Sequence, residues 1–201
     1  MFSWKELLDV ISLALSYSEE KRPALAARVQ MLQKPPYSFP SSERVGRGGR
    51  AAYSLDHALK LIYFFKLLEI SAPPANAIRL ISEEWPMLAS ATGDAIISPP
   101  DYPYGTFLLV RGGGGDVFRE PGEFPAPHPQ ASDPDCPFQI RGILDLSPTE
   151  LLTGIAGRPD WFDCTSLIWV GGVAKALLEQ ASKSEHGTAE LLTAARSWAA
   201  N

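Results

Sequence analysis

The stretch from Glu43 to Leu61 reads ERVGRGGRAAYSLDHALKL, and it decides how the first half of the chain is interpreted. Its opening part, residues 43–50, combines three arginines with three glycines, and glycine supplies the positive φ angles that tight hairpin turns need. Ser54 then acts as the N-cap of an amphipathic helix predicted to run to about residue 70. We therefore expect a short glycine-tipped β-hairpin followed at once by a helix.

Two helices are predicted to precede this hairpin. Ser3 and Glu6 form a capping box ahead of an apolar stripe, which indicates a first helix over residues 4–16. Pro23 suits the first turn of a second helix, whose apolar residues recur every three or four positions until the proline pair at 35–36 ends it. The predicted order is helix, turn, helix, hairpin, helix.

Charge is distributed unevenly along the chain, whose net charge is −5. Residues 1–90 carry 11 Lys/Arg and 9 Asp/Glu, a net of +2, and residues 91–201 carry 7 and 14, a net of −7. Seven basic residues lie in residues 21–50 against the single acid Glu43, a local net of +6. Such a cluster is typical of a nucleic-acid-binding surface, and a solvated basic surface is the alternative.

The second half is predicted to be a small α+β unit. A fourth helix from about Pro74 ends before Pro86, and the Pro/Ser/Ala/Gly-rich residues 86–105 mark a boundary. Beyond it we expect strands at 106–111, 116–120 and 138–146, with GGGG (112–115) as a turn and a proline-rich loop at 120–137. Residues 162–181 are either a strand leading into a helix or wholly a helix, and 188–200 form a terminal helix.

The first 85 residues resemble the MerR-type winged helix. In that family a helix-turn-helix leads to an Arg/Gly wing that closes on a tyrosine, and a helix pair follows. Here the wing and the next helix are matched by RVGRGGRAAYSLDHALKL, with one extra alanine before Tyr53, and the helix turn is matched by LEISAP with serine replacing glycine. The family's usual pattern in the first helix is absent, as is a long coiled-coil helix after residue 85.

The resemblance implies DNA binding through a recognition helix in the major groove and a wing on the phosphate backbone. It implies recognition-helix contacts for Lys21, Arg22 and Arg28. It implies phosphate contacts for Arg44, Arg47, Arg50 and Tyr53. Two alternatives stay open: Tyr53 packs at the base of the wing instead, and Arg28 forms an ion pair with Glu19 or Glu20 instead.

Other kinds of site find little support in the sequence. The apolar runs are shorter than the roughly 20 residues of a membrane span, and we expect a cytoplasmic protein. Cys136 and Cys164 show no CxxC spacing, and three scattered histidines predict no metal site. RGGGGD (111–116) lacks the remainder of a phosphate-binding motif, and the aspartates in the second half have no ligand spacing. We therefore expect neither an enzyme nor a bound cofactor.

The leading hypothesis is a bacterial or phage-like transcriptional regulator. It comprises a MerR-like winged helix domain that binds double-stranded DNA (residues 1–88), a linker (89–105) and a small α+β dimerisation or regulatory domain (106–201). A homodimer would form through apolar helical faces in SLIWVGGVAKALL and LLTAARSW. The alternative is a protein-interaction adaptor that keeps the winged-helix scaffold and places its basic wing on an acidic protein surface.

Overall fold

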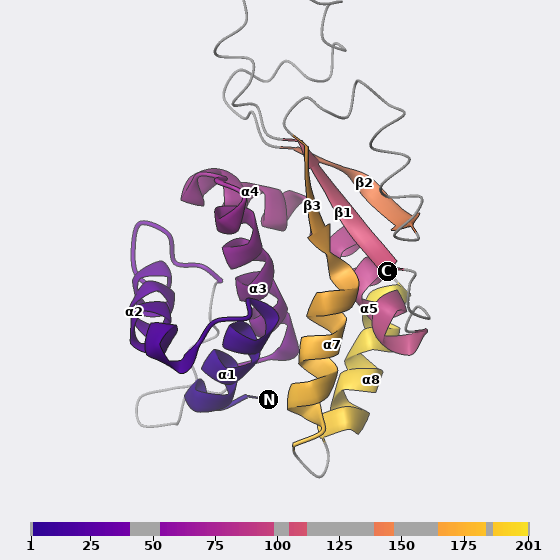
Figure 1. Cartoon of the computed structure of the whole chain (residues 1–201), viewed down its shortest axis with the longest axis horizontal. Coiled ribbons are helices and arrows are strands. Elements are labelled where there is room, and N and C mark those ends of the chain that lie inside the picture. The colour runs from indigo at the N-terminus through magenta and orange to yellow at the C-terminus, as the bar shows by residue number, and fades with distance from the viewer. Residues whose placement is uncertain are drawn as a thin grey trace, which may run out of the picture. The chain divides into compact units, whose positions relative to one another are not determined.

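The structure is a computed structural model that describes residues 2–40, 53–98, 105–111, 139–146, 165–183 and 187–200. These residues form mostly helices and a small antiparallel sheet, which agrees with the predicted α+β class (Figure 1). The first helices are α1 (Trp4–Ala14), the 3₁₀ helix η1 (Glu19–Lys21), α2 (Arg22–Leu32) and α3 (Leu55–Glu69). The others are α4 (Pro74–Glu83), α5 (Trp85–Ile97), α7 (Val170–Ala181) and α8 (Gly187–Ala199). The strands are β1 (Gly105–Arg111), β2 (Gln139–Leu146) and β3 (Thr165–Trp169).

The chain divides into two compact units. The first, here called the helical unit, contains residues 1–99 and 171–201, and the second, the sheet unit, contains residues 100–170. The predicted division differs, because it placed 106–201 in one domain. The C-terminal helices belong with the N-terminal helices since α8 packs closely on α5, and the chain therefore leaves the helical unit and returns to it.

The predicted capping signals are confirmed at both helices that carry them. The Ser3 side chain accepts a hydrogen bond from the backbone N–H of Glu6 at 3.3 Å, and the backbone N–H of Ser3 donates to the Glu6 carboxylate at 2.7 Å. Ser54 accepts from the backbone N–H of His57 at 3.1 Å at the start of α3. These caps satisfy backbone donors that have no partner inside the helix.

The predicted linker is wrong over residues 89–97, which are part of α5. The prediction that a helix from Pro74 ends before Pro86 is confirmed, because α4 ends at Glu83. The missed feature is that Pro86 lies in the first turn of a further helix, α5, where a proline lacks only a hydrogen bond that the helix does not make. The small residues that suggested a boundary, among them Ala89, Ala91 and Gly93, are buried in the helical unit. They permit close packing of another helix.

The centre of the helical unit is α3. Eight side chains of this helix are at most 1% exposed: Ala58, Leu59, Leu61, Ile62, Tyr63, Phe64, Phe65 and Leu67. The sequence predicted one wide apolar face. Burial extends further round because α1 and α4 pack on α3 and because α5 and α8 also contact it, through Tyr63–Thr92 and Asp56–Trp198. A helix that is apolar on nearly all sides belongs in an interior.

The C-terminal helix is held by a very close approach and a polar contact. A Cβ atom on Gly93 of α5 would lie 2.5 Å from the carbonyl oxygen of Ala195, so only glycine fits there. The indole Nε1 of Trp198 donates a hydrogen bond of 2.8 Å to Oδ1 of Asp56, 142 residues away in the sequence. These contacts join the last helix of the chain to α5 and to the first turn of α3.

The sheet unit contains a three-stranded antiparallel sheet in the order β2-β1-β3. Leu108 of the central strand β1 is opposite Ile143 of β2 and Ile168 of β3, and the β1–β2 register shifts between Leu109 and Val110. Strands predicted at 106–111 and 138–146 are confirmed, and of the two interpretations of residues 162–181 the strand leading into a helix is correct. The strand predicted at 116–120 and the proline-rich loop lie outside the described residues.

Candidate nucleic-acid interface

The candidate interface is built on α1, η1 and α2. The Tyr17 backbone N–H donates to the carbonyl oxygen of Ser12 at 2.9 Å, which ends α1, and the chain reverses into η1 through Ser16, whose φ is 54°. The apolar positions Leu25, Val29 and Leu32 bury one face of α2. The opposite face of α2 is left on the surface.

Arg22 anchors the start of α2 to α1. Its guanidinium lies 2.5 Å from a carboxylate oxygen of Asp9, 3.4 Å from Glu19, and donates a hydrogen bond of 3.3 Å to the carbonyl oxygen of Lys5. The Arg22 side chain is 23% exposed. With these partners Arg22 fixes the orientation of α2. These contacts give Arg22 a positioning role at the start of α2, and its predicted contact with DNA stays a prediction.

Tyr17 and Glu69 connect η1 to the end of α3. The ammonium group of Lys21 lies 5.2 Å from the centre of the Tyr17 ring, a cation–π contact, and the Tyr17 hydroxyl is hydrogen-bonded to the Glu69 carboxylate. Partial burial and the negative charge of Glu69 raise the pKa of Tyr17, while the positive charge of Arg28 lowers it. Glu69 also lies 3.2 Å from Lys66. These contacts hold the start of α2 against α3.

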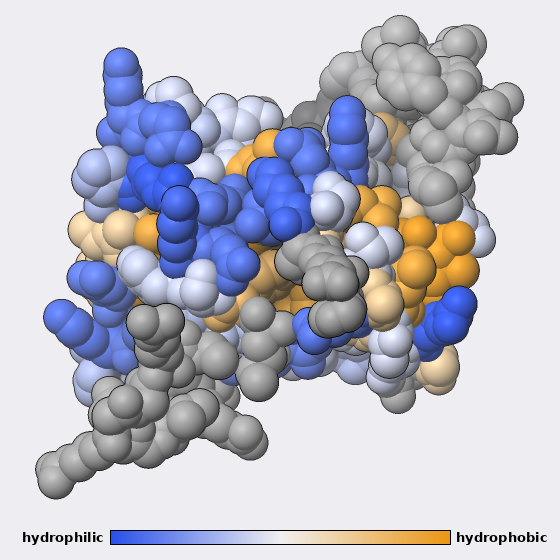
Figure 2. Space-filling view, turned by 90° about the horizontal axis from the view of Figure 1, so that it is seen from below, coloured by the Kyte–Doolittle hydropathy of each residue, from blue (hydrophilic) through white to orange (hydrophobic). Residues whose placement is uncertain are grey.

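The other predicted α2 contacts are on the surface. The side chains of Lys21 and Arg28 are both exposed, and so is Lys34 beyond the end of the helix. Arg28 was given an alternative role as the ion-pair partner of Glu19 or Glu20. In the structure, Glu19 pairs with Arg22 instead. Seen from below, the left of the molecule, where α1 and α2 lie, is largely hydrophilic (Figure 2).

Tyr53 packs in the structure. It is 8% exposed, its ring lies 5.8 Å from the Trp4 ring and 6.4 Å from the His57 ring, and its backbone exchanges hydrogen bonds of 2.7 and 2.8 Å with Phe2. Of the two roles considered for Tyr53, packing is the one that this geometry fits. The antiparallel bridge to Phe2 also places Tyr53 beside the start of α1.

Arg44, Arg47 and Arg50 lie outside the described residues, and so do the predicted hairpin and its glycines. The two ends of this segment are described and are anchored in the helical unit. On one side, the Phe39 ring lies 5.8 Å from the Phe64 ring of α3, and the backbone N–H of Phe39 donates to the carbonyl oxygen of Leu32. On the other side is the Phe2–Tyr53 bridge. The described chain on either side of residues 41–52 therefore packs against α1, α2 and α3.

Other sites considered in the sequence are not found in the part of the chain that the structure describes. Within those ranges there is no group of three or more His, Cys, Asp or Glu residues placed to hold a metal ion. Nδ1 of His57 lies 2.7 Å from the Ser54 hydroxyl at the helix cap. Cys136, Cys164 and His128 are outside the described residues. No described helix has the length and apolar character needed to cross a membrane.

Comparison with known proteins gave no relatives: no family model, curated protein or solved structure matches the chain.

Sequence reasoning missed the residues that neutralise and fix Arg22. Glu19 and Glu20 directly precede Lys21 and Arg22, and this proximity in the sequence was an available signal that the cationic window is partly compensated. Asp9 was not predictable in this role, because its contact with Arg22 depends on the angle between α1 and α2 rather than on local sequence.

Proposed function

We propose that residues 1–88 form a winged helix-turn-helix that binds double-stranded DNA and that the protein is a transcriptional regulator. The observation that carries the proposal is the packing of α1, α2 and α3 together with the two anchored ends of residues 41–52. The described residues on either side of this segment, Pro40 and Tyr53, belong to the helical unit that also contains the exposed face of α2, and the segment itself contains three arginines and three glycines. A helix for the major groove and a cationic loop for phosphate are the two parts that such binding needs.

The positive charge that supports DNA binding is concentrated, among the described residues, along α2 and just after it. Lys21, Arg28 and Lys34 are exposed along and after α2, and α2 itself contains no acidic residue. With Arg22 engaged by Asp9, the expected phosphate contacts are Lys21 and the three arginines of the 41–52 segment. About four such contacts would give a slope of log K against log salt of about −3.6.

The experiment is fluorescence anisotropy of full-length protein on duplex DNA over a salt series. Replacing Arg44, Arg47 and Arg50 together with alanine should weaken binding and reduce the slope by about 2.7. A matched control removes three positive charges elsewhere, from the exposed residues Lys175, Lys183 and Arg196. A slope near zero for the wild type, or equal effects of the two triple variants, would contradict the proposal.

A second candidate function is a protein-interaction adaptor. The specific observation that favours it is Met31 of α2, which is 52% exposed on a face that also carries alanines. Competition with an acidic polypeptide such as poly-glutamate distinguishes the two functions. If the protein is an adaptor for acidic proteins, poly-glutamate should displace duplex DNA of any sequence with similar efficiency. If the protein binds DNA specifically, base contacts should make a preferred duplex much harder to displace. The full chain is required, because cutting off residues 91–201 would remove α7, α8 and the second half of α5 from the helical unit.

The apolar faces predicted to form the dimer contact are used for packing within one chain. Val173, Leu177, Leu191 and Trp198 belong to the apolar faces that were expected to join two copies, but they are buried within the chain. A two-fold DNA site would still require a dimer. Among the described residues of 106–201, the region predicted to form the dimer contact, Trp169 at the end of β3 is the large apolar side chain that is exposed, at 47%. It is therefore available for a contact between two copies.

A further inference from the structure

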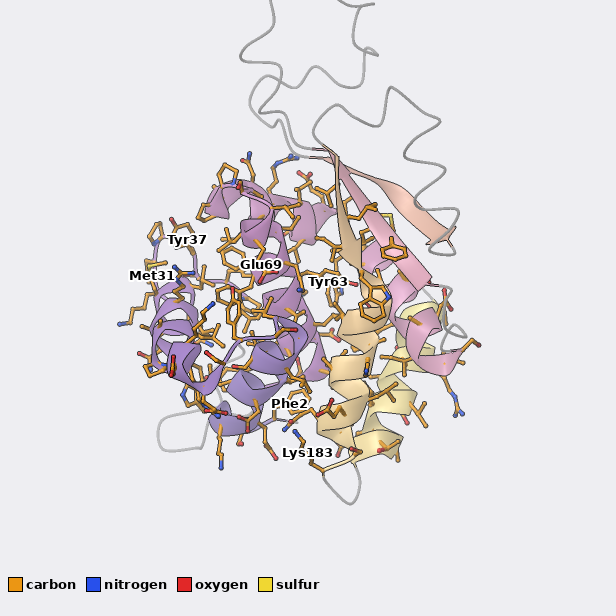
Figure 3. All side chains as sticks on the ribbon, in the orientation of Figure 1. Phe2, Met31, Tyr37, Tyr63, Glu69 and Lys183 are labelled. Carbon is orange, nitrogen blue, oxygen red and sulfur yellow. The ribbon has the colours of Figure 1, made fainter. Side chains whose placement is uncertain are left out.

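The exposed face of α2 carries an unusual set of side chains. Ala24, Ala27, Arg28 and Met31 follow the spacing i, i+3, i+4 and i+7, so they lie on one side of the helix, and all four are exposed. We call them the α2 face. Figure 3 shows Met31 on the outer side of α2. The face offers one hydrogen-bonding group, the Arg28 guanidinium, among methyl and thioether groups.

We infer that the α2 face recognises thymine methyl groups and one guanine in the major groove of DNA, an inference that rests on the proposed function. Alanine side chains make apolar contact with the thymine C5-methyl group, and arginine donates two parallel hydrogen bonds to O6 and N7 of guanine. The sequence preference would therefore come from Ala24, Ala27 and Arg28, while Lys21 and the arginines at 44, 47 and 50 supply affinity independent of sequence.

Size and orientation both suit a helix that enters the groove. An α-helix with its side chains is about 10–12 Å across and the major groove is about 12 Å wide, so alanines at the contact allow the backbone to lie close to the base edges. The Arg22–Asp9 ion pair fixes α2 on α1, which keeps the α2 face directed outward without a further ordering cost. Buried Leu25, Val29 and Leu32 hold the opposite side.

Charge favours DNA over a protein as the occupant. Lys21 precedes the α2 face and Arg28 lies within it, and no acidic side chain occurs from Lys21 to Lys34, although the exposed Glu19 and Glu20 lie directly before Lys21. The charged side chains within the α2 face and C-terminal to it are therefore cationic, which favours a polyanion. An apolar protein groove would contact Met31 and the alanines but would offer no hydrogen-bond acceptor to the Arg28 guanidinium.

The geometry also gives a spacing. Ala24 and Arg28 are four residues apart, which is a rise of about 6 Å along the helix. Two base-pair steps span about 6.8 Å, since each step is about 3.4 Å. The thymine next to Ala24 and the guanine next to Arg28 should therefore lie about two base pairs apart, with Ala27 near a thymine between them or beside them.

The test begins with selection of preferred duplexes from a random library by the full-length protein. The expected motif contains a thymine about two base pairs from a guanine. Deoxyuridine in place of that thymine removes only the methyl group and should weaken binding about fourfold, the value of one buried methyl. Arg28→Lys keeps the charge but loses the paired hydrogen bonds, so preference for guanine at its position should fall tenfold or more while the salt slope is unchanged.

The matched control is Arg196→Lys on the exposed side of α8, which should leave both the motif and the affinity unchanged. Selection of a motif that is insensitive to deoxyuridine and to Arg28→Lys would overturn the inference and leave DNA binding itself intact. Binding without any selected motif would do the same. Absence of duplex binding would overturn the proposed function as well and would point to a protein occupant of the α2 face.

Discussion

Replacing Gly93 with alanine tests the contact that brings the C-terminal helix onto the N-terminal helices. The new Cβ would lie 2.5 Å from the carbonyl oxygen of Ala195, 3.0 Å from the backbone nitrogen of Ala199 and 3.2 Å from Cβ of Trp198. Ordinary contact begins at 3.4 Å, so the methyl group requires a displacement of about 0.9 Å, the difference between 3.4 and 2.5 Å. Two of these atoms belong to the backbone, and relief therefore means moving α8 as a whole.

Two effects of opposite sign decide the magnitude. Alanine in a helix interior is more favourable than glycine by about 1 kcal/mol. Overpacking a well-packed contact costs about 1–3 kcal/mol, and the rigid backbone of α8 puts Gly93→Ala at the upper end of that range. The net expectation is a loss of about 2 kcal/mol in the free energy of unfolding. For a chain of this size, that corresponds to a decrease in melting temperature of about 4–8 °C.

The assay is urea unfolding followed by circular dichroism at 25 °C, with Asp94→Ala as the control. Asp94 is the next residue of α5 and is exposed, so its replacement should change stability by less than about 0.5 kcal/mol. A Gly93→Ala protein as stable as the wild type, or more stable, would refute the close approach of α5 and α8. It would leave the Trp198–Asp56 hydrogen bond as the remaining contact described here between α8 and the N-terminal helices.

Two further predictions concern polar contacts inside the helical unit. Hydrogen bonds from Ser3 lower the pKa of Glu6, so the charged form stabilises the fold above the ordinary carboxyl pKa and this contribution is lost as pH falls through the lowered value. Glu6→Gln should therefore lower stability by about 0.5 kcal/mol at pH 7 in urea unfolding, and the difference should disappear once the pH falls below the lowered pKa of Glu6; a constant difference would contradict the capping role. The Thr92 hydroxyl donates to the Leu88 carbonyl oxygen at 2.8 Å, so the buried Tyr63 hydroxyl must donate to Thr92 at 2.7 Å, and Thr92→Val should cost about 1–3 kcal/mol. Adding Tyr63→Phe should recover part of that loss in a double-mutant cycle, and strictly additive effects would show that the two hydroxyls do not interact.

Several features of the fold were predictable because their signals are local. The capping residues Ser3 and Ser54 and the apolar spacing along α1, α2 and α3 predicted these helices nearly at their observed bounds. Pro86 correctly indicated the end of α4, but α5 was missed because a proline can also occupy the first turn of the next helix, and only the residues that pack around residues 85–97 show that such a helix follows.

In the candidate interface too, the features that depend on neighbouring residues were predictable, and those that depend on contacts between helices were not. Lys21 and Arg28 are exposed as expected from their place off the apolar stripe of α2. Arg22 has the same charge and is a neighbour of Lys21, yet its contact with Asp9 gives it a structural role. Tyr53 was left between two roles by the sequence, and its burial beside Trp4 fits the packing role.

By itself, the sequence determined the approximate bounds of α1, α2, α3, α4 and α8 and of strands β1 and β2, and it showed which segment concentrates positive charge. Only the tertiary structure decided which faces remain exposed and where the last helix belongs. The physical reason is that periodicity and capping act between residues a few positions apart, whereas the fit of α8 against Gly93 and the Trp198–Asp56 hydrogen bond join residues distant along the chain. Such contacts depend on the shapes of two surfaces that neither segment specifies alone.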